Sequence, residues 1–411
     1  MGLQPNILWI VTTQWRAQAC GYAGDVQART PWVDGLASEA VSFAQAVTPH
    51  PLGPQARAAL LTGKLCPENG VSGYWDALRP GTRTVAHALN DLGYATAWFG
   101  KWHLSQRDRS VPFVGEAHAR QRVWPEQRGG FAFWEGFEGG FLLNDPWLHG
   151  TRLDEPRHFK GYQADVLAQR AGEWCREQEE HRVAGSSPFF AVVSLESPHP
   201  PYHAPTPHVQ APEPAGLALR GNVPTGGDVE KQARAELAGY YAHIEATDRA
   251  IGRLLAEIDL MQTIVVFTSV HGDMHGSHGL FRKAWPYEES IRVPLLIKHL
   301  PGKGPGRIDQ QPVSLVDLSH MTIAWAQGGE WHCKHDSALI SMPSATEIAL
   351  QCPQAWYGFR SAQHKLVLTR DAAGRAVPWL FFDLARDPLE LVNLAADAGR
   401  QDEIREMMRW L

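Results

Sequence analysis

The sequence predicts an α/β protein in which a mostly parallel sheet lies between helices, followed by a small C-terminal antiparallel sheet with a helix. Two observations predict this fold class. In the first part of the chain, short and nearly continuous apolar runs alternate with segments of helical periodicity, and such runs are typical of strands buried on both faces of a sheet. After about residue 330 the pattern changes to short strands joined by a turn. We therefore expect two units, residues 1–330 and residues 331–411.

Apolar runs predict four strands of the main sheet. These runs are 6–12, 95–99, 189–194 and 263–268. Apolar side chains at positions 85, 89 and 92 share one helical face, and Gly93 ends that helix. A longer apolar stripe between Leu237 and Leu255 predicts a second helix. Strands that alternate with helices in this way indicate a doubly wound sheet.

The segment after residue 330 is predicted to be a small antiparallel unit. Its expected strands are 356–360, 365–369 and 379–383. Asp371–Gly374 has the residue types of a hairpin turn between the second and third strands, and a final helix is expected over 402–411. Two segments rich in Pro and Gly, 110–130 and 203–227, are predicted to form surface loops. One option is that these loops cover a pocket.

The composition limits the partners and the compartment that we expect. A net charge of −6 over 411 residues gives no overall attraction to nucleic acid or to an acidic membrane, so we expect neither as a partner. The five cysteines are scattered and form no C-x-x-C pair, which predicts reduced thiols and a cytoplasmic protein. We identify no signal peptide and no apolar run of membrane-spanning length. Homo-oligomerisation is left open by the sequence.

Polar clusters follow all four strands predicted for the main sheet. In chain order, the clusters are Thr12-Thr13-Gln14, Lys101-Trp102-His103, His199 and His271-Gly272-Asp273. In open α/β sheets, ligands bind beyond the carboxyl ends of the strands. Because four clusters reach that edge, the sequence predicts a ligand pocket there.

The chain resembles the sulfatase and phosphonate monoester hydrolase family of the alkaline phosphatase superfamily in motifs spread over nearly its whole length. The segment Gly53–Gly63 resembles the signature helix of the family, and Gly100–Leu104 resembles its G-K-W-H-L motif. Further matching segments are 6–11, 30–37, 197–202, 271–283 and 382–394. The resemblance implies an alkaline-phosphatase-like fold with a mixed, mostly parallel sheet sandwiched by helices. These motifs are specific for the fold and not for a substrate.

Departures from the family pattern fall on the metal site and the nucleophile. The family has an Asp at the end of the first strand, where this chain has Thr13, and another Asp before the late His, where it has Val270. The nucleophilic Cys or Ser, often a Cys matured to formylglycine, is replaced by Gly53 or, if the register shifts by one, by Leu52. Of the metal ligands only His271 is kept, and a divalent metal needs several. We therefore predict no metal, no formylglycine and no other cofactor.

The cationic and histidine positions of the family are retained, and the resemblance implies that they contact an anionic group and its leaving oxygen. The predicted catalytic residues are Lys101, His103, His199, His271 and Lys283, and the predicted substrate-binding residues are Arg57, Gly53 and Thr13. Arg and Lys bind oxyanions through charge-assisted hydrogen bonds. The helix that opens near Pro54 directs free N–H groups to the same place. A bracing role is the alternative for Arg57 and for Asp273.

Loss of the metal carboxylates changes the electrostatics that we expect in the pocket. Lys101, Lys283 and Arg57 are left without those counter-charges. Mutual repulsion should therefore lower the pKa of a lysine and keep nearby histidines neutral. A neutral Lys or His can act as a general base. Alternatively, a bound anion neutralises the cluster, so we expect a small anionic molecule as the partner.

Three functions from different classes follow from these observations. The first, which we favour, is a metal-independent enzyme that acts on a small anionic or carbonyl-bearing molecule by His/Lys acid–base chemistry. The second is a non-catalytic pseudosulfatase that binds a sulfated or phosphorylated ligand. The third is a conventional sulfuric ester or phosphoester hydrolase in which His50, Asp273 or His275 substitutes for the lost ligands.

Overall fold

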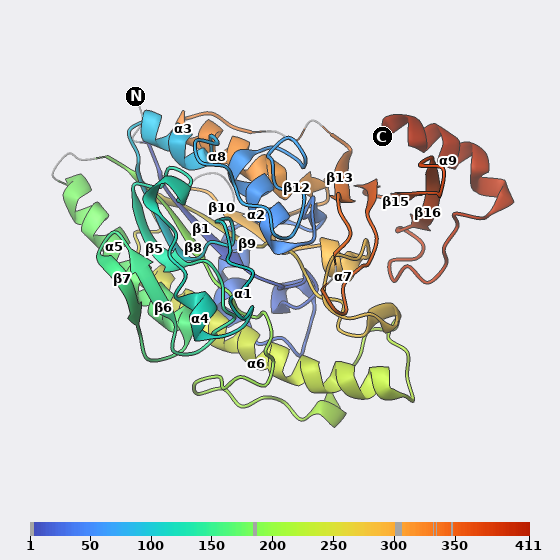
Figure 1. The fold of residues 1–411 in the computed structure, drawn as a ribbon, viewed down its shortest axis with the longest axis horizontal. Helices are drawn as coiled ribbons and strands as arrows, with labels where there is room; N and C mark the ends of the chain where they lie inside the picture. The colour runs from blue at the N-terminus through green and yellow to red at the C-terminus, as the bar shows by residue number, and fades with distance from the viewer. Residues whose placement is uncertain (1–3, 184–186, 301–305, 332, 334, 347) are drawn as a thin grey trace.

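A ten-stranded sheet forms the centre of the molecule in the computed structural model, with helices against both of its faces (Figure 1). The structure describes residues 4–183, 187–300, 306–331, 333, 335–346 and 348–411. The order of the strands in the sheet is β11-β2-β10-β9-β1-β8-β4-β5-β6-β7. The predicted fold class, a mixed and mostly parallel sheet between helices with a small antiparallel sheet after it, is confirmed.

The five central strands of this sheet run parallel. In spatial order they are β9 (Thr263–Ser269), β1 (Asn6–Thr12), β8 (Phe189–Ser194), β4 (Ala95–Lys101) and β5 (Phe133–Phe137). All residues of β1 and β9 are buried, as expected for strands covered on both faces. The four strands predicted from apolar runs are therefore confirmed.

Alternate residues of β1 pack into two different hydrophobic cores, one on each face of the sheet. Leu8 and Ile10 pack on one face with α1 (Pro31–Glu39), α5 (Gln163–Val183) and α6 (Asp228–Ala256). Trp9 and Val11 pack on the other face with α2 (Gly53–Thr62), α3 (Val85–Asp91) and α8 (Leu318–Ala326). The period-2 alternation of a strand thus divides the apolar residues between the two layers of helices.

The outer strands of the sheet were not predicted, and several of them run antiparallel. On one side these are β10 (Leu295–Lys298), β2 (Val41–Phe43) and β11 (Arg307–Asp309), and on the other β6 (Trp147–Gly150) and β7 (Leu153–His158). They are short, and β7 is mostly exposed and contains Pro156, which suits an edge strand. Strands of this kind lack the long apolar run that identifies a central strand.

A four-stranded antiparallel sheet follows, near the C-terminus (Figure 1). Its strands are β13 (Ser337–Met342), β14 (Trp356–Ser361), β15 (His364–Arg370) and β16 (Ala376–Asp383). The hairpin turn at Asp371–Gly374 is confirmed by the hydrogen bond from Gly374 N to Asp371 O (2.8 Å). The final helix, α9 (Gln401–Met407), continues into a 3₁₀ turn. The strand β13 was missed, and the division of the chain at residue 330 stays a prediction.

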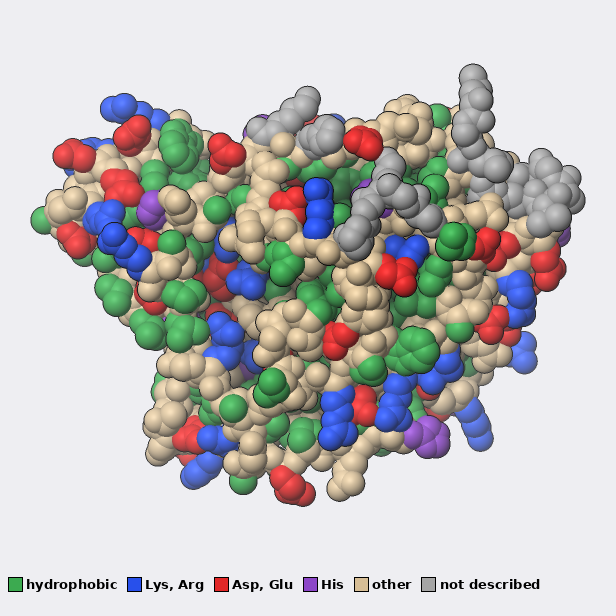
Figure 2. All heavy atoms as spheres, turned by 180° about the vertical axis from the view of Figure 1, so that it is seen from behind, with side chains coloured by type: hydrophobic (Ala, Val, Ile, Leu, Met, Phe, Trp, Pro, Cys, Tyr) green, Lys and Arg blue, Asp and Glu red, His purple; other side chains and the backbone are tan. Residues whose placement is uncertain are grey.

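The two predicted loop segments are largely irregular, as expected. The first contains the short helix α4 (Glu116–Ala119) and a 3₁₀ turn at Pro125–Gln127, and the second contains a 3₁₀ turn at Pro214–Gly216. On the face drawn in Figure 2, acidic and basic side chains are interspersed. None of the helices that the structure describes is long and apolar enough to cross a membrane.

A buried ion network attaches the antiparallel sheet to α7 (Glu288–Ile291) of the main unit. Glu288 contacts Arg360 (3.0 Å) and Lys365 (3.3 Å), which lie on β14 and β15. Lys365 also pairs with Glu390, whose Oε2 accepts a hydrogen bond from Glu288 N (2.8 Å). The carboxylates and cations of the network are buried together, so each depends on the others for compensation.

We predict that Lys365→Met lowers the free energy of unfolding by about 3–5 kcal/mol, because it leaves buried carboxylates without their shared cation. Equilibrium urea unfolding measures this loss. The matched control is Arg375→Met, since Arg375 is 79% exposed in its pair with Asp371 and such pairs contribute about 0–1 kcal/mol. Equal losses in the two variants would contradict the structural role of the network.

Candidate functional site

A cavity of about 140 Å³ lies beyond the carboxyl ends of the central strands. Its apolar wall includes Tyr74, Phe113 and Phe141, which belong to none of the sequence motifs. The predicted site residues that line it are Thr13, Gly53, Lys101, His103, His199, His271 and Lys283. The structure therefore brings together residues from all four predicted clusters and from the signature helix.

The first residue of the helix α2 lines this cavity. That residue is Gly53, the N-cap of the helix is Leu52, and a proline lies in its first turn. The first N–H groups of a helix have no intrahelical partners and carry a partial positive charge. A Cβ atom placed on Gly53 would lie 2.8 Å from His103 Nδ1. The absence of a side chain at position 53 is therefore what allows His103 to approach the helix.

Arg57 is the predicted site residue that does not line the cavity. Its guanidinium donates to Thr13 Oγ1 (2.9 Å), Ser194 Oγ (2.6 Å) and Lys101 O (3.2 Å). These groups lie at the carboxyl ends of β1, β8 and β4, so Arg57 holds three strand ends together. This arrangement favours the bracing alternative over the predicted anion clamp, because three N–H donors of Arg57 are taken by protein oxygens and Arg57 does not line the cavity.

Lys101 retains a buried counter-charge. Its Nζ lies 2.6 Å from Glu196 Oε1, and the side chains are 1% and 0% exposed. Glu196 Oε2 accepts a further hydrogen bond from Gln163 Nε2 (3.2 Å). Lys101 therefore has a counter-charge other than the metal carboxylates, which the sequence did not predict. Glu196 was missed although it lies only three residues before His199 in the chain, because nothing in that segment indicates its partner.

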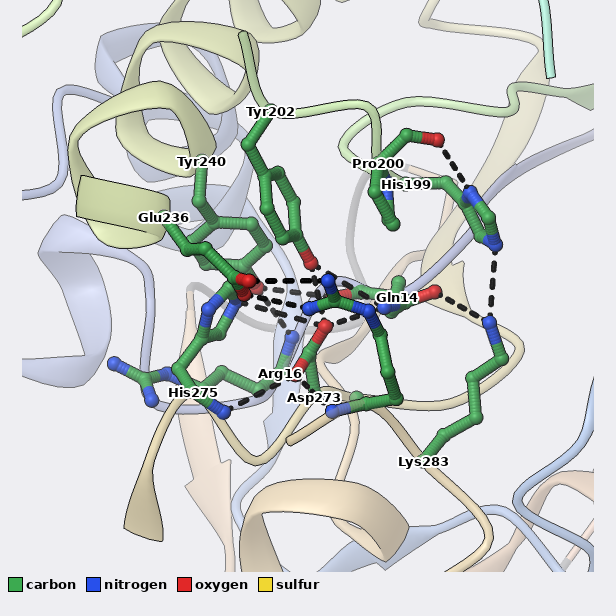
Figure 3. Close-up of polar contacts among 12 residues, drawn as sticks. Gln14, Arg16, His199, Pro200, Tyr202, Glu236, Tyr240, Asp273, His275 and Lys283 are labelled. Carbon is green, nitrogen blue, oxygen red and sulfur yellow. Dashed lines mark hydrogen bonds and ion pairs between the residues drawn. The ribbon is translucent and has the colours of Figure 1, made fainter. Parts of the chain in front are cut away.

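Lys283 and His199 form a hydrogen-bonded pair in the cavity (Figure 3). His199 Nδ1 lies 2.7 Å from the carbonyl oxygen of Pro200 and so donates to it, which leaves Nε2 as an acceptor. Lys283 Nζ donates to this Nε2 (3.0 Å) and to Gln14 Oε1 (2.7 Å). His199 is thus placed as a neutral imidazole with a defined tautomer.

Burial is the main cause of the electrostatic shifts in the cavity. Burial and, second, the charge of Lys101 lower the pKa of Lys283 to about 7. Burial, with nearby cations, also holds the pKa values of His103, His199 and His271 well below their ordinary range. The predicted direction of these shifts is confirmed, whereas repulsion between cations is the smaller contribution.

Asp273 braces Gln14 (Figure 3) and does not line the cavity. Its carboxylate accepts hydrogen bonds from the side chains of Gln14 and Tyr202, and from the backbone N–H groups of His275 (3.1 Å) and Arg282 (3.0 Å). Burial favours the protonated form of Asp273, but His275, Arg282 and these hydrogen bonds outweigh it and lower its pKa. Asp273 is therefore saturated by protein donors.

The residues around His271 do not fit the divalent metal that the resemblance implies. His271 Nδ1 lies 3.0 Å from Gly272 O, and its buried Nε2 has no hydrogen-bond partner among the described residues. The two Asp positions that the resemblance assigns to the metal are occupied by Thr13 and Val270, and the nucleophile position is occupied by Gly53. Thr13 Oγ1 donates to Leu195 O (2.9 Å) and accepts from Arg57. One imidazole nitrogen does not make a site for a hard cation.

The substitute ligands considered from the sequence do not line the cavity. His50 Nε2 accepts a hydrogen bond from Cys66 N (3.1 Å), and the ring of His275 packs 4.2 Å from that of Tyr240. Within the described residues, the one group of three His and carboxylate side chains close enough for a metal is His278, Glu289 and Glu390, which does not line the cavity either. Neither His50, Asp273 nor His275 replaces the missing ligands.

Comparisons with known proteins show the family and the fold of the chain. Residues 5–328 match the family model described as Sulfatase. An ulvan-active sulfatase from Formosa agariphila is 35% identical over 416 residues, covering 95% of this chain and 77% of that protein. An arylsulfatase from Clostridium perfringens is 26% identical, covering 100% and 93%. The crystal structure of a phosphonate monoester hydrolase from Agrobacterium radiobacter has a TM-score of 0.74 at 22% identity, covering 99% and 94%.

We predict that Lys283 titrates with a midpoint near 7, because burial and Lys101 disfavour its ammonium form. NMR spectra of the full chain with ¹³C-labelled lysine, recorded as a function of pH, measure this midpoint from the Cε signal. The signal that disappears in Lys283→Arg assigns the resonance. A midpoint near the ordinary lysine value of about 10.4 would contradict the described environment of Lys283.

Proposed function

Because this chain belongs to the sulfatase family, we propose that it uses the hydrolase fold of that family for metal-independent acid–base chemistry on a small anionic or carbonyl-bearing molecule. The observation that carries the proposal is the placement of Lys283 between two fixed acceptors in the cavity. The lowered pKa of Lys283 supports it, since a base is most effective when its pKa lies near the working pH.

Lys283 is the proposed general base. A neutral amine has two N–H groups and one lone pair. Gln14 Oε1 and His199 Nε2 accept the two N–H groups, so the lone pair is left to receive a proton from the ligand. The ammonium form instead has a third N–H in that direction, which binds an anionic oxygen. The same geometry thus serves proton abstraction when Lys283 is neutral and anion binding when it is charged.

Lys101 and the start of α2 are the proposed anion-binding groups. Glu196 compensates the charge of Lys101 without removing its other N–H donors. The ring of Phe141 lies 4.4 Å from Lys101 Nζ and stacks on His199 with centroids 4.6 Å apart, which fixes one wall of the cavity beside Lys101 and the neutral His199. Negative charge that develops on the ligand would meet donors already in position, the arrangement that stabilises a transition state most effectively.

We propose that the ligand carries one sulfate or carboxylate group on a small organic body. Names of relatives point to sulfated compounds, among them an N-acetylglucosamine-6-O-sulfatase from Bacteroides thetaiotaomicron and a choline-sulfatase from Rhizobium meliloti. N-acetylglucosamine 6-sulfate and choline sulfate are therefore suitable first probes. We retain a cytoplasmic location, and the absence of nucleic-acid and membrane partners, as proposals from composition alone.

Binding without turnover is the second candidate function. Two hydroxyl groups at the cavity favour it, because neither is activated. Thr13 Oγ1 donates a hydrogen bond to Leu195 O and accepts one from Arg57. Burial raises the pKa of the Tyr74 hydroxyl above its ordinary value. Neither hydroxyl is prepared as a nucleophile. Ester hydrolysis with substitute metal ligands is the weakest candidate, because the described residues place none of those ligands at the cavity.

The sign of the pH dependence separates the two leading functions. If Lys283 is the base, kcat/KM for a cognate probe rises as pH increases through about 7, because the neutral form is the active one. Product would be followed by mass spectrometry in the presence of a chelator. If Lys283 only binds as an ammonium, affinity measured by calorimetry falls over the same pH range and no product forms.

We predict that Lys283→Met lowers kcat/KM by at least about 100-fold, the usual contribution of a general base. The matched control is Lys231→Met, because Lys231 is 82% exposed on α6, remote from the cavity lining, and its loss should leave turnover unchanged. Equal turnover by Lys283→Met and the wild type would contradict the proposed base.

A further inference from the structure

A buried arginine beside the cavity has no part in the chemistry described so far. Arg107 is 2% exposed, and its Nη1 lies 2.8 Å from His103 Nε2. Its Nη2 donates to Tyr74 O, and its Nε lies 3.6 Å from Glu138 Oε1. Neither Arg107 nor Glu138 was identified from the sequence. An arginine buried at this depth against an imidazole needs a physical explanation.

The contact with Arg107 determines which nitrogen of His103 carries the proton. A guanidinium has only donors and keeps its charge, so His103 Nε2 must be the acceptor. Tyr74 OH lies 3.3 Å from the same nitrogen and can donate to it as well. Burial and the charges of Arg107, Lys101 and Arg57 hold the pKa of His103 well below its ordinary value, so the ring is neutral. A neutral ring whose Nε2 accepts carries its single proton on Nδ1.

This Nδ1–H lies over Gly53, where the family has its nucleophile. A Cβ at position 53 would lie 2.8 Å from Nδ1 and 3.2 Å from Cε1 of His103. The imidazole therefore occupies the space next to the backbone that a nucleophilic side chain would need. The backbone of His103 is fixed as well, because His103 N donates to Glu138 O (3.1 Å) with φ at +60°.

The orientation of Arg107 is itself set by several contacts. Its guanidinium carbon lies 4.6 Å from the ring centroid of Tyr74 and 5.0 Å from that of Trp75. Glu138, which faces its Nε, accepts hydrogen bonds from Ser105 N (3.1 Å) and Ser105 Oγ (2.8 Å). Aromatic faces and a fixed carboxylate hold a guanidinium in one plane. Arg107 is therefore a rigid donor toward His103.

We propose that Arg107 is a positioning residue that holds His103 as its Nδ1–H tautomer and directs that N–H over Gly53 to donate a hydrogen bond to the bound anion. The inference deepens the proposed function by giving His103 the role of donor and leaving that of base to Lys283. It also explains Gly53, since any larger residue would displace the ring from this position.

Two-bond ¹H–¹⁵N correlation spectra of the histidine rings test the tautomer directly in the full chain. His103, assigned by the signals lost in His103→Gln, should show a protonated Nδ1 and an unprotonated Nε2 at neutral pH. A protonated Nε2 in the wild type would overturn the inference. This measurement needs no turnover, so it stays decisive even if Lys283 proves not to be a base.

Variants of Arg107 separate positioning from general stability. Arg107→Met should produce a mixture of His103 tautomers, whereas Arg107→Lys, which keeps a donor toward Nε2, should restore the Nδ1–H form. A pure Nδ1–H form in a folded Arg107→Met protein would overturn the role of Arg107. If Arg107→Met does not fold, the comparison of wild type with Arg107→Lys decides, since loss of the Nδ1–H form despite a retained donor would contradict the assignment.

The relation between Gly53 and His103 has its own matched pair of variants. Gly53→Ala should shift the ring signals of His103, because the added methyl group meets Nδ1. Gly35→Ala is the control, since a Cβ there has no heavy atom within 4 Å. Addition of inorganic sulfate to the wild type should move the Nδ1 signal of His103. An unchanged Nδ1 signal at saturating sulfate would contradict the donor role, and unchanged signals in Gly53→Ala would contradict the described contact.

Discussion

Several cations lie buried where the central strands end, and the cost of burying them governs the rest of the site. A charge taken out of water must be paired, hydrogen-bonded or neutralised. Lys101 is paired with Glu196 at 2.6 Å. Arg57 donates its hydrogen bonds to oxygens at three strand ends. Lys283 is bonded to neutral acceptors and compensates instead through a pKa lowered to about 7. Under the proposed function, these three solutions correspond to a cation that binds the anion, a brace between strand ends and a general base.

The same constraint acts in a cavity that has the cationic positions implied by the resemblance but not the metal-binding carboxylates. Thr13 and Val270 occupy positions where the resemblance implies carboxylates, and Gly53 occupies that of the nucleophile. Without those groups, the electrostatic potential at the cavity depends on the two lysines and Glu196, because the imidazoles that line the cavity are neutral. His103 then approaches the backbone at Gly53. The cavity is therefore lined by hydrogen-bonding groups, among them Lys101, Lys283 and His103.

Features that follow from the local sequence pattern could be predicted, whereas contacts between residues far apart in the chain could not. The buried strands and the convergence of their polar ends follow from apolar runs and strand polarity, so both were predictable. Glu196 could not be paired with Lys101 from the sequence, because their contact joins β8 to β4 across 95 positions. Arg107 follows no strand and belongs to no motif, and the role of Arg57 depends on which oxygens the fold brings to it. Outer strands such as β7 are too short and polar to give a strand signal.

The metal content of freshly purified protein, measured by inductively coupled plasma mass spectrometry without added chelator, decides whether the cavity works without a metal. We expect Ca, Mg, Mn and Zn far below one ion per chain, with no change in His271→Ala, because His271 is the one residue kept of the metal ligands that the resemblance implies. Near-stoichiometric metal that is lost in His271→Ala would contradict the proposed metal-independent site and make a hydrolase with rearranged ligands the leading interpretation.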